Sequence, residues 1–571
     1  MPQNINQRSR LLRVVLFTLN SRYIHSTLAP WCLKAGLAAF AQIPHEGLVV
    51  EGTVNEPMDK VQRRLVAAAP DVLGISCYIW NILEISRLLP QLRAALPDCV
   101  VVMGGPEVGH RAENALNQYP EADYILAGEG EMPFAQLVDA VSGLRPLETV
   151  PGLCRRLDGK SIIKEPYVHG GPALSPYCPA YFEQLKGRIA YLETSRGCPY
   201  DCAFCLSGRR EALRFLPLEQ AFEEILRLAG SGAKTIKFVD RTFNADRKRA
   251  LDVLRFIADA WGKEIPEGVT FHFEIAGDLL DGETLDLIAG SPKGLFQFEI
   301  GLQSMREETL LNVRRKTDMA RLLRNVSRLI ASGTAHVHLD LIAGLPGEGL
   351  DAFAPGLDIA HALHPQTLQL GFLKLLHGSA MRDNPARYPC VFSPMPPYEA
   401  LETPDMSRED FALLHQTELA LDKLHNSGRF IKTLRFLTEG CGISPFSLYL
   451  KLYGTVKEGQ SLDETTNLLY DFLSGWLPDE SARIHDCLLH DRLATTLTSV
   501  LPACLKQEGA PYHQAKRALN RIIPKEGGAV RAFGFLRSGE VKALLYCDHA
   551  KKDPVTGQYE VFEMPLAGLG L

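Results

Sequence analysis

The sequence of 571 residues lacks any run of about 18 uncharged apolar residues, so we expect no helix that spans a membrane. It also lacks an excess of positive charge, because 61 Lys and Arg oppose 67 Asp and Glu and leave a net charge of −6. This balance gives no global signature of binding to nucleic acid or to a membrane surface. Repeats and low-complexity segments are missing too, and with 46% apolar residues the chain is predicted to be globular.

Thirteen cysteines are an odd number in a long chain, and three of them fall within eight residues. That grouping suits metal binding in a reducing compartment better than disulfides, so a cytoplasmic location is expected. At about 150 residues per domain, the length predicts about three to four domains. The apolar run Leu12–Asn20 is predicted to be a buried strand rather than part of a signal sequence, because Arg13 interrupts it.

The first 150 residues alternate short apolar runs with amphipathic stretches, which predicts an α/β fold with a parallel sheet covered on both faces. Ligands of such sheets bind at the carboxyl ends of the strands. The glycines at these ends would let the backbone approach a ligand closely, or they would only make tight turns. The expected strands are residues 12–20, 47–55, 71–78, 99–104 and 122–127, and the loops that follow include Asn20–His25, Ser76–Asn81, Gly104–Glu107 and Gly128–Glu131.

This segment resembles the flavodoxin-like, Rossmann-type cobalamin-binding domain of B12-dependent radical enzymes. Ser76-x-Tyr78, followed after 25 residues by Gly104-Gly105, is similar to the Ser-x-Leu and Gly-Gly elements of the nucleotide-tail pocket, with a departure at Tyr78. The Asp-x-His-x-x-Gly element is missing, so a bound cobalamin would not take its lower ligand from it, and His25 is predicted to be a hydrogen-bonded loop residue. The candidate cobalamin contacts are Ser76, Tyr78, Asn81, Gly104, Gly105, Glu107, Gly128, Glu129 and Gly130.

The segment IAYLETSRGCPYDCAFC, residues 189–205, is a strand followed at once by Cys198-x-x-x-Cys202-x-x-Cys205. This spacing lets one loop bring three thiolates to a single inorganic cluster, whereas structural zinc usually draws paired ligands from two places. Scattered structural cysteines are the alternative. The pattern resembles the signature of the radical S-adenosylmethionine (SAM) superfamily, in which three cysteines bind a [4Fe–4S] cluster and SAM chelates the open iron. Phe204 matches the aromatic residue that this family places beside the adenine.

The region after the cysteines repeats a strand and helix pattern, with expected strands at residues 189–195, 234–242, 269–276, 295–303, 335–343 and 367–375. Six units match the open, partial (β/α)6 barrel of that superfamily, whose functional face is the carboxyl end of the strands. Asp240 stands where many members carry a Gly-Gly-Glu-like element, so its assignment as a cofactor contact departs from the pattern. By resemblance, the SAM contacts fall at Glu274, Gln303, Gly344, Leu345, Pro346, Gly347 and Glu348.

Strand parity gives an expectation that does not depend on the family, because side chains alternate between the two faces of a strand. In residues 271–276, 296–303 and 336–341 one face is apolar and should meet the helices. The other face would line a polar lumen that holds cofactor and substrate, with mutual salt bridging as the alternative. Glu299 and Asp340 thereby become candidate cofactor contacts. The inward side chains are His272, Glu274, Gln297, Glu299, Gln303, His336, His338 and Asp340.

Four segments are expected: a cobalamin-binding domain at residues 1–150, a linker at 151–185, the radical SAM barrel at 186–390, and a C-terminal domain at 391–571. A Pro-rich joint at 393–397 marks the last boundary. The C-terminal domain is predicted to be mostly helical with a small terminal sheet at residues 530–537, 541–547 and 558–564, and it resembles an uncharacterised extension on one branch of cobalamin-dependent radical enzymes. The cysteines beyond Tyr388 lack ligand spacing and are predicted to be buried: Cys390, Cys441, Cys487, Cys504 and Cys547.

These resemblances together imply a cobalamin-dependent radical SAM enzyme that methylates an unactivated carbon through a 5′-deoxyadenosyl radical and methylcobalamin. They also imply an external electron donor of the flavodoxin or ferredoxin type and a small-molecule or peptide substrate. Three alternatives stay open. The first is cyclisation or rearrangement without methyl transfer, and the second is methylthio transfer to tRNA, with Cys32, Cys77 and Cys99 binding a second cluster. The third is a non-catalytic cobalamin sensor or carrier, against which the three-cysteine loop argues.

Overall fold

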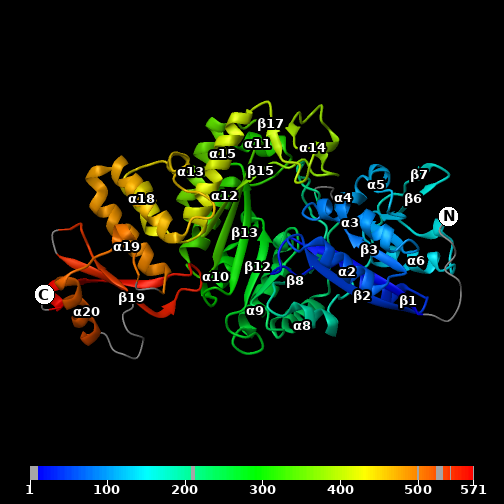
Figure 1. Cartoon of the computed structure of the whole chain (residues 1–571), viewed down its shortest axis with the longest axis horizontal. Helices are drawn as coiled ribbons and strands as arrows, with labels where there is room; N and C mark the ends of the chain where they lie inside the picture. Colours follow the sequence, from blue (N-terminus) through cyan, green and yellow to red (C-terminus); the bar gives the residue numbers. More distant parts are fainter. Residues whose placement is uncertain (1–10, 208–211, 498–499, 523–531, 540–541, 570–571) are drawn as a thin grey trace. The chain divides into compact units, whose positions relative to one another are not determined.

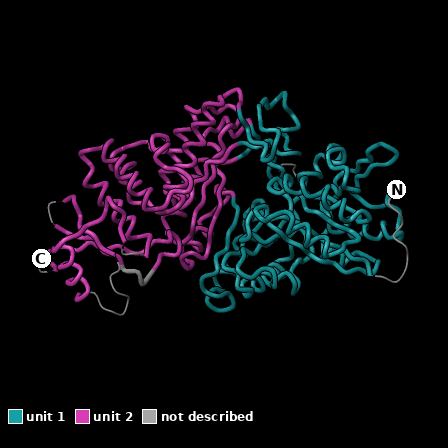
Figure 2. Tube along the Cα trace, viewed as in Figure 1, with its two compact units in different colours: residues 1–275, 313–316, 373–401 teal, residues 276–312, 317–372, 402–571 magenta. Residues whose placement is uncertain are grey.

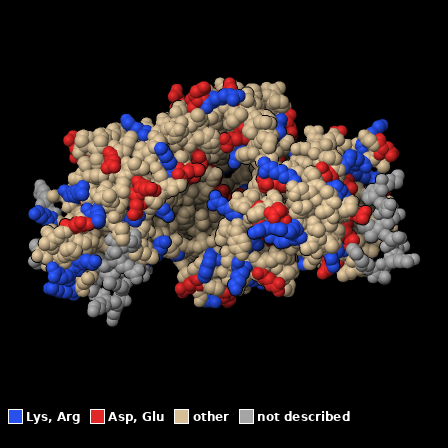
Figure 3. All heavy atoms as spheres, in the orientation of Figure 1, with Lys and Arg blue, Asp and Glu red and all other residues tan. Residues whose placement is uncertain are grey.

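The computed structural model describes residues 11–207, 212–497, 500–522, 532–539 and 542–569, with residues 548–551 described by their backbone alone. The chain forms two compact units, residues 1–275, 313–316 and 373–401 and residues 276–312, 317–372 and 402–571 (Figure 2). Positive and negative side chains are interspersed over the face shown in Figure 3. Among the described helices, none combines the length and the apolar character that a membrane span requires.

The N-terminal part of the first unit is a seven-stranded sheet with the order β2-β1-β3-β4-β5-β6-β7 (Figure 1). Its first five strands pair in parallel, as predicted, in the order of flavodoxin-like folds. Strands β6 and β7 extend the sheet in the antiparallel direction, although they lie in the segment predicted to be a linker. The seven strands are β1 (Leu12–Asn20), β2 (His45–Thr53), β3 (Val72–Ser76), β4 (Val100–Gly104), β5 (Tyr124–Leu126), β6 (Leu153–Leu157) and β7 (Lys160–Ile162).

Helices cover both faces of this sheet because its central strands are apolar on both sides. Val15 and Phe17 of β1 belong to one core cluster with residues of α2, α3 and α5, whereas Val14 and Leu16 belong to a second cluster with residues of α1 and α6. The run Leu12–Asn20 is therefore the buried strand that its sequence predicts. The helices are α1 (Ala29–Phe40), α2 (Met58–Ala68), α3 (Ile82–Ala95), α4 (Pro106–Gly109), α5 (Ala112–Gln118) and α6 (Glu131–Val141).

The first unit also holds the first three strands of the predicted barrel. Strand β11 pairs in parallel with both β8 and β12. A short antiparallel pair, β9 and β10, flanks the cysteine loop. The strands are β8 (Ala190–Leu192), β9 (Ser195–Arg196), β10 (Arg214–Phe215), β11 (Thr235–Phe238) and β12 (Thr270–Ile275), and the helices are α7 (Pro179–Leu185), α8 (Leu218–Ala229), α9 (Arg247–Ala260) and α14 (Ala380–Asp383).

In the second unit, β14 pairs in parallel with β13 and β15, so all six predicted barrel strands are present. Helices of the C-terminal region pack on this half. The Asp358 carboxylate accepts hydrogen bonds from Ser444 Oγ (2.6 Å) and Phe446 N (2.7 Å), and Asn426 Oδ1 accepts one from Leu368 N (2.8 Å). The elements are β13 (Phe296–Gln303), β14 (His336–Ala343), β15 (Thr367–Phe372), α10 (Gly282–Gly290), α11 (Glu307–Asn312), α12 (Met319–Ala331) and α13 (Leu350–Ala362).

The C-terminal region is mostly helical, and α15 begins with a capping box formed by Ser407 and Asp410. The small terminal sheet is antiparallel; residues 530, 531 and 541 of the predicted strands lie outside the described residues. Its helices and strands are α15 (Arg408–Leu421), α16 (Ile431–Arg435), α17 (Pro445–Lys451), α18 (Leu462–Trp476), α19 (Ser481–Thr495), α20 (Ala510–Ile522), β18 (Phe533–Phe535), β19 (Ala543–Lys552) and β20 (Tyr559–Pro565), and the hairpin β16 (Val391–Phe392) and β17 (Ala400–Glu402) precedes them.

The prediction that the cysteines after residue 389 are buried is correct only for Cys547. The other four, Cys390, Cys441, Cys487 and Cys504, are half-buried. Their missing ligand spacing argues against metal binding, but it carries no information on depth, since a thiol tolerates partial exposure.

Candidate active site

The three cysteines of the loop after β9 are free thiols, with Cys198 and Cys202 buried and Cys205 half-buried. A turn in which Cys205 N donates to Cys202 O (3.1 Å) brings the last two together. The Cys198 Sγ atom lies 3.7 Å from Thr242 Oγ1, at the end of the neighbouring strand β11. Phe204, which directly precedes Cys205 in the sequence, is half-buried. The loop thus presents the thiols at the carboxyl end of the first barrel strand.

Asp240, a predicted cofactor contact, instead fixes the chain just before this loop. Its Oδ1 atom accepts hydrogen bonds from Thr194 N (2.7 Å) and Ser195 N (3.0 Å), and its Oδ2 atom accepts one from the Thr194 hydroxyl. Only 1% of Asp240 is exposed, and burial raises the pKa of its carboxyl to about 6 against the opposing effect of these donors. Both oxygens have partners within the protein, so the carboxylate positions the loop.

Replacing Asp240 with alanine is expected to lower the free energy of unfolding by about 1–3 kcal/mol, because buried donors of Thr194 and Ser195 lose their acceptor. Asp240→Asn keeps one carbonyl oxygen and should lie between alanine and wild type. Urea denaturation of the three proteins measures the effect. Equal midpoints for wild type and Asp240→Ala would show that the carboxylate does not hold the strand end.

Residues more than 100 positions further along the chain cover the cysteine loop. Ala203 N donates to Val313 O (2.9 Å), and the carboxylate of Asp201 pairs with Arg314 (3.4 Å). The Arg315 Nη1 atom lies 4.0 Å from Cys202 Sγ, where burial raises the pKa of the thiol and the guanidinium opposes that rise. Sequence analysis did not single out these residues, and the only local signal was the Arg-Arg-Lys run at 314–316.

Glu129, predicted to contact cobalamin, belongs to an ion-pair network on the flank of the cysteine loop. It pairs with Arg196 (3.3 Å) and Arg214, and it accepts a hydrogen bond from His169 N (3.1 Å). Burial alone would raise the pKa of Glu129, but the two arginines outweigh it and lower the pKa. Arg196 pairs in addition with Glu131 (2.6 Å). The network ties the loop after β5 to strands β9 and β10.

The side chains of two further predicted cobalamin contacts are also used within the chain. Asn81 is fully buried, and its amide donates to Leu19 O and Ser76 O (both 3.1 Å) while its Oδ1 accepts from Tyr78 N (2.8 Å). Glu107 accepts a hydrogen bond from the Tyr398 hydroxyl (2.7 Å), and burial raises the pKa of its carboxyl. Both side chains are therefore hydrogen-bonded within the chain and hold the loops at these strand ends.

Two of the four glycines predicted to contact cobalamin, Gly105 and Gly128, have positive φ, and neighbouring backbone leaves no room for a side chain at either. A Cβ atom on Gly105 (φ +100°) would lie 2.5 Å from Cys77 O, and one on Gly128 (φ +91°) would lie 2.1 Å from Tyr167 O. Close approach of neighbouring backbone is therefore enough to require glycine at both positions. A Cβ on Gly104 would meet only Leu126 O at 3.6 Å, an ordinary contact, and a Cβ on Gly130 would meet a Leu33 methyl group at 2.9 Å.

Two aromatic side chains, Tyr78 and Trp80, lie in the loop after the carboxyl end of β3. Tyr78 and Trp80 stack with their ring centroids 4.4 Å apart and an angle of 4°, and 48% of Trp80 is exposed. Sequence analysis included Trp80 in the loop without giving it a role. His25 is hydrogen-bonded to the Tyr191 hydroxyl (2.7 Å), as predicted for a structural loop residue.

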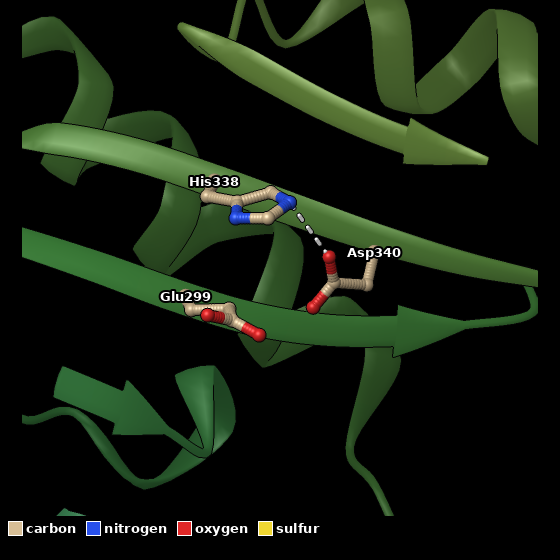
Figure 4. Close-up of side chains that lie close together, drawn as sticks. All are labelled: Glu299, His338 and Asp340. Carbon is tan, nitrogen blue, oxygen red and sulfur yellow. Dashed lines mark ion pairs between the residues drawn. The ribbon is translucent and has the colours of Figure 1, made fainter. Parts of the chain in front are cut away.

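The predicted strand parity is confirmed in the second unit. Along β13 and β14, buried residues alternate strictly with half-buried ones, and Glu299, His338 and Asp340 lie on the half-buried face (Figure 4). The His338 Nε2 atom lies 2.9 Å from Asp340 Oδ1. In the first unit, Glu274 of β12 pairs with Lys237 (3.5 Å), while His272 is buried. Salt bridging, the alternative to an open polar chamber, is therefore present in both units.

The remaining predicted SAM contacts lie at the carboxyl ends of β13 and β14. Gln303 has φ +68°, and its Oε1 atom is buried with no hydrogen-bond partner among the described residues. Such strain is found mainly at functional sites. After β14, Gly344 has φ +88°, Leu345 is buried, and Pro346 O accepts a hydrogen bond from Asn312 Nδ2 (3.2 Å). The buried Glu348 accepts a hydrogen bond from Ser304 Oγ (2.7 Å).

The three cysteines proposed for a second cluster do not form a ligand set. Cys77 and Cys99 lie within the hydrophobic core on one side of the N-terminal sheet, and Cys32 lies on α1, which covers the other side. Burial raises the pKa of all three thiols, which disfavours the thiolate form that binds metal. The methylthio-transfer alternative loses its structural basis.

Comparison with protein families identifies the parts of the chain. Residues 16–138 match the model described as "B12 binding domain", residues 192–355 match "Radical SAM superfamily", and residues 386–529 match "Protein of unknown function (DUF4080)". The fold and the cysteine loop thus define a chain with a cobalamin-binding domain followed by a radical SAM domain. The predicted fold class is confirmed. The two matched families agree with the predicted cofactors, a [4Fe–4S] cluster, SAM and cobalamin.

Two curated relatives cover most of the chain. The 2-(S-pantetheinyl)-carbapenam-3-carboxylate methyltransferase of Streptantibioticus cattleyicolor is 28% identical over 67% of this chain and 59% of its own length. The cobalamin-dependent radical SAM methyltransferase TokK of Streptomyces tokunonensis is 27% identical over 71% of this chain and 62% of its own. The chain thus spans about three fifths of the length of these relatives. Parts of it match the B12-binding and radical SAM family models, and it is similar to a cobalamin-dependent radical SAM methyltransferase.

Two solved structures share the fold. The cobalamin-dependent SAM radical enzyme OxsB, with aqua-cobalamin and SAM bound, aligns with a TM-score of 0.60 and 16% identity over 84% of this chain and 78% of its own. The radical SAM methyltransferase TsrM from Kitasatospora setae, with cobalamin and a [4Fe–4S] cluster bound, aligns with a TM-score of 0.54 and 19% identity over 65% of this chain and 74% of its own.

Proposed function

We propose that the chain is a cobalamin-dependent radical SAM methyltransferase that acts on an unactivated carbon of its substrate. The observation that carries this proposal is the loop with Cys198, Cys202 and Cys205 at the end of the first barrel strand, in a chain that begins with a cobalamin-binding domain. The two curated relatives described above are both named as methyltransferases. The proposal also includes a small-molecule or peptide substrate and an external electron donor of the flavodoxin or ferredoxin type.

The residues around the loop suit a [4Fe–4S] cluster with SAM on its open iron. Three thiols supply three ligands from one loop. Hydrogen bonds to Asp240 fix the chain just before that loop, and one to Val313 O fixes it between Cys202 and Cys205. Arg315, beside Cys202, carries a permanent positive charge where a chelating carboxylate would lie next to the cluster. We therefore assign Arg315 to the carboxylate of SAM.

Replacing Arg315 with leucine is expected to weaken SAM binding by about 10- to 150-fold, the value of one charge-assisted hydrogen bond. Arg315→Lys keeps the positive charge but loses the two parallel donors of the guanidinium, so its SAM affinity should lie between those of the wild type and Arg315→Leu. Arg314→Leu is the matched control, since that arginine pairs with Asp201. Equilibrium binding of SAM to the reconstituted proteins, together with their iron content, measures the effect. Unchanged SAM affinity in Arg315→Leu at full iron content would contradict the assignment.

The carboxyl ends of strands β3 and β4 in the N-terminal sheet offer a surface for cobalamin. Gly104 leaves its backbone open, and Tyr78 and Trp80 form a stacked aromatic pair in which 48% of Trp80 is exposed. An apolar, planar surface of this kind suits contact with a large ring system. We propose that these residues, together with the main chain of Ser76, contact cobalamin, and that Asn81, Glu107 and Glu129 hold the loops in place.

When bound, the cofactors supply the chemistry: an electron from the cluster, a 5′-deoxyadenosyl radical from SAM that removes a hydrogen atom, and a methyl group from cobalamin. The chain positions them. Asp240 and the Arg196 network hold the cysteine loop, Arg315 would orient SAM, and the burial of Cys198 and Cys202 keeps water from their thiols.

A test of this function needs no substrate. The protein is reconstituted without oxygen with iron, sulfide and hydroxocobalamin, reduced with dithionite in place of the natural donor, and given SAM. A methyltransferase is expected to form S-adenosylhomocysteine and methylcobalamin in equal amounts, and to release 5′-deoxyadenosine and methionine. Release of 5′-deoxyadenosine without any S-adenosylhomocysteine would instead favour cyclisation or rearrangement without methyl transfer.

A further inference from the structure

One cluster of metal-ligating side chains lies away from the cysteine loop in the sequence. Glu299 of β13 is directly opposite His338 in the parallel register, and Asp340 follows two residues later on the same face of β14. The three ligand atoms all lie within 4.8 Å of one another, and all three residues are half-buried (Figure 4). The exposed fractions of the His338 and Asp340 side chains are 15% and 18%. Two adjacent strands of one sheet hold them rigidly.

The spacing and the charge of this cluster suit a divalent ion. Donor atoms about 2.0–2.1 Å from a zinc-sized ion lie about 3.0–3.4 Å apart on neighbouring coordination positions. The distance from His338 Nε2 to Asp340 Oδ1, 2.9 Å, is close to this range. Two carboxylates and one neutral imidazole carry two negative charges, which a divalent cation neutralises without protonating His338.

We propose that Glu299, His338 and Asp340 bind one divalent first-row transition-metal ion. Nitrogen and oxygen donors of this kind suit Mn²⁺, Fe²⁺ and Zn²⁺, and the set contains no thiolate, which the iron–sulfur cluster requires. Three protein ligands leave at least one coordination position for water or for an oxygen-bearing group of a substrate, as in catalytic metal sites. The site is separate from Cys198, Cys202 and Cys205 in its ligands, and it does not rest on the proposed methyl transfer.

The experiment uses the full chain with its cluster oxidised and with hydroxocobalamin, because both are then diamagnetic. Mn²⁺ is titrated, and the electron paramagnetic resonance signal of the free aquo ion is measured. The wild type is expected to remove one Mn²⁺ per chain from solution, and added Zn²⁺ should release it. Glu299→Gln, His338→Gln and Asp340→Asn should each weaken Mn²⁺ binding at least tenfold.

His336→Gln is the matched control, because His336 lies on the same strand and the same face as His338. It should bind Mn²⁺ as the wild type does. A second measurement needs no variant: electron spin-echo modulation of the bound Mn²⁺ in the wild type should show a directly coordinated imidazole nitrogen.

Three results would overturn the proposal. The first is no binding of Mn²⁺ or Zn²⁺ at millimolar concentration, which would leave His338 and Asp340 as an ion pair. The second is binding that the three folded variants retain in full. The third is bound Mn²⁺ with no nitrogen coupling.

Discussion

Replacing Cys198, Cys202 and Cys205 together with alanine is expected to abolish both the iron–sulfur absorption of the reconstituted protein and the reductive cleavage of SAM. Alanine offers no ligand atom, and the loop has no other thiol or imidazole between residues 193 and 207 to substitute for the lost ligands. Since metal binding is coupled to the ordering of its ligand loop, the variant should also lose the stabilisation that reconstitution gives to the wild type. Iron analysis, absorption spectra and melting with and without reconstitution measure these effects.

Cys441→Ala is the matched control for this variant. Cys441 is a half-buried free thiol like Cys205, but it lies in the C-terminal region without ligand spacing. Its replacement should leave four irons per chain and the full rate of SAM cleavage. A triple variant of the cysteine loop that still holds four irons would place the cluster elsewhere and would remove the basis of the proposed function.

The features that sequence patterns predicted are those with a local or periodic signature. The alternation of Phe298 and Glu299 with their neighbours predicted the two faces of β13, because period two is a property of the strand itself. The three cysteines lie within eight residues directly after a strand, and this local spacing predicted that one loop carries all three. Strands β6 and β7 were missed because both are short and carry charged residues, such as Arg155 and Arg156 of β6, so that they resemble a linker in the sequence.

The features that the sequence could not predict depend on which partner a polar residue finds. Asn81, Glu107 and Glu129 stand at strand ends. A polar residue there has the same sequence pattern whether its side chain contacts a ligand or another part of the chain. The cover of the cysteine loop by Val313 and Arg315 joins segments more than 100 residues apart, so no local pattern records it. Burial and hydrogen-bond partners distinguish these cases, and they exist only in the folded chain.

The adjacent glycines Gly104 and Gly105 illustrate this limit, because the sequence assigns both to the nucleotide tail of cobalamin. Gly105→Ala is expected to lower the stability of the N-terminal domain by about 2–5 kcal/mol, since it combines a left-handed φ of +100° with a Cβ only 2.5 Å from Cys77 O. Both the strain and the clash involve backbone, which cannot move aside as a side chain can. Bound cobalamin should be lost together with the fold of this domain.

Gly104→Ala is expected to separate the two roles. Its Cβ would make an ordinary contact of 3.6 Å with Leu126 O, so the melting temperature should stay within about 2 °C of the wild type. If Gly104 contacts cobalamin, the added methyl group occupies space that the cofactor needs, and cobalamin binding should weaken although the domain remains folded. Melting curves and cobalamin titrations on the two variants decide the matter. A stable Gly105→Ala would refute the backbone argument, and a Gly104→Ala that binds cobalamin like the wild type would remove Gly104 from the cofactor site.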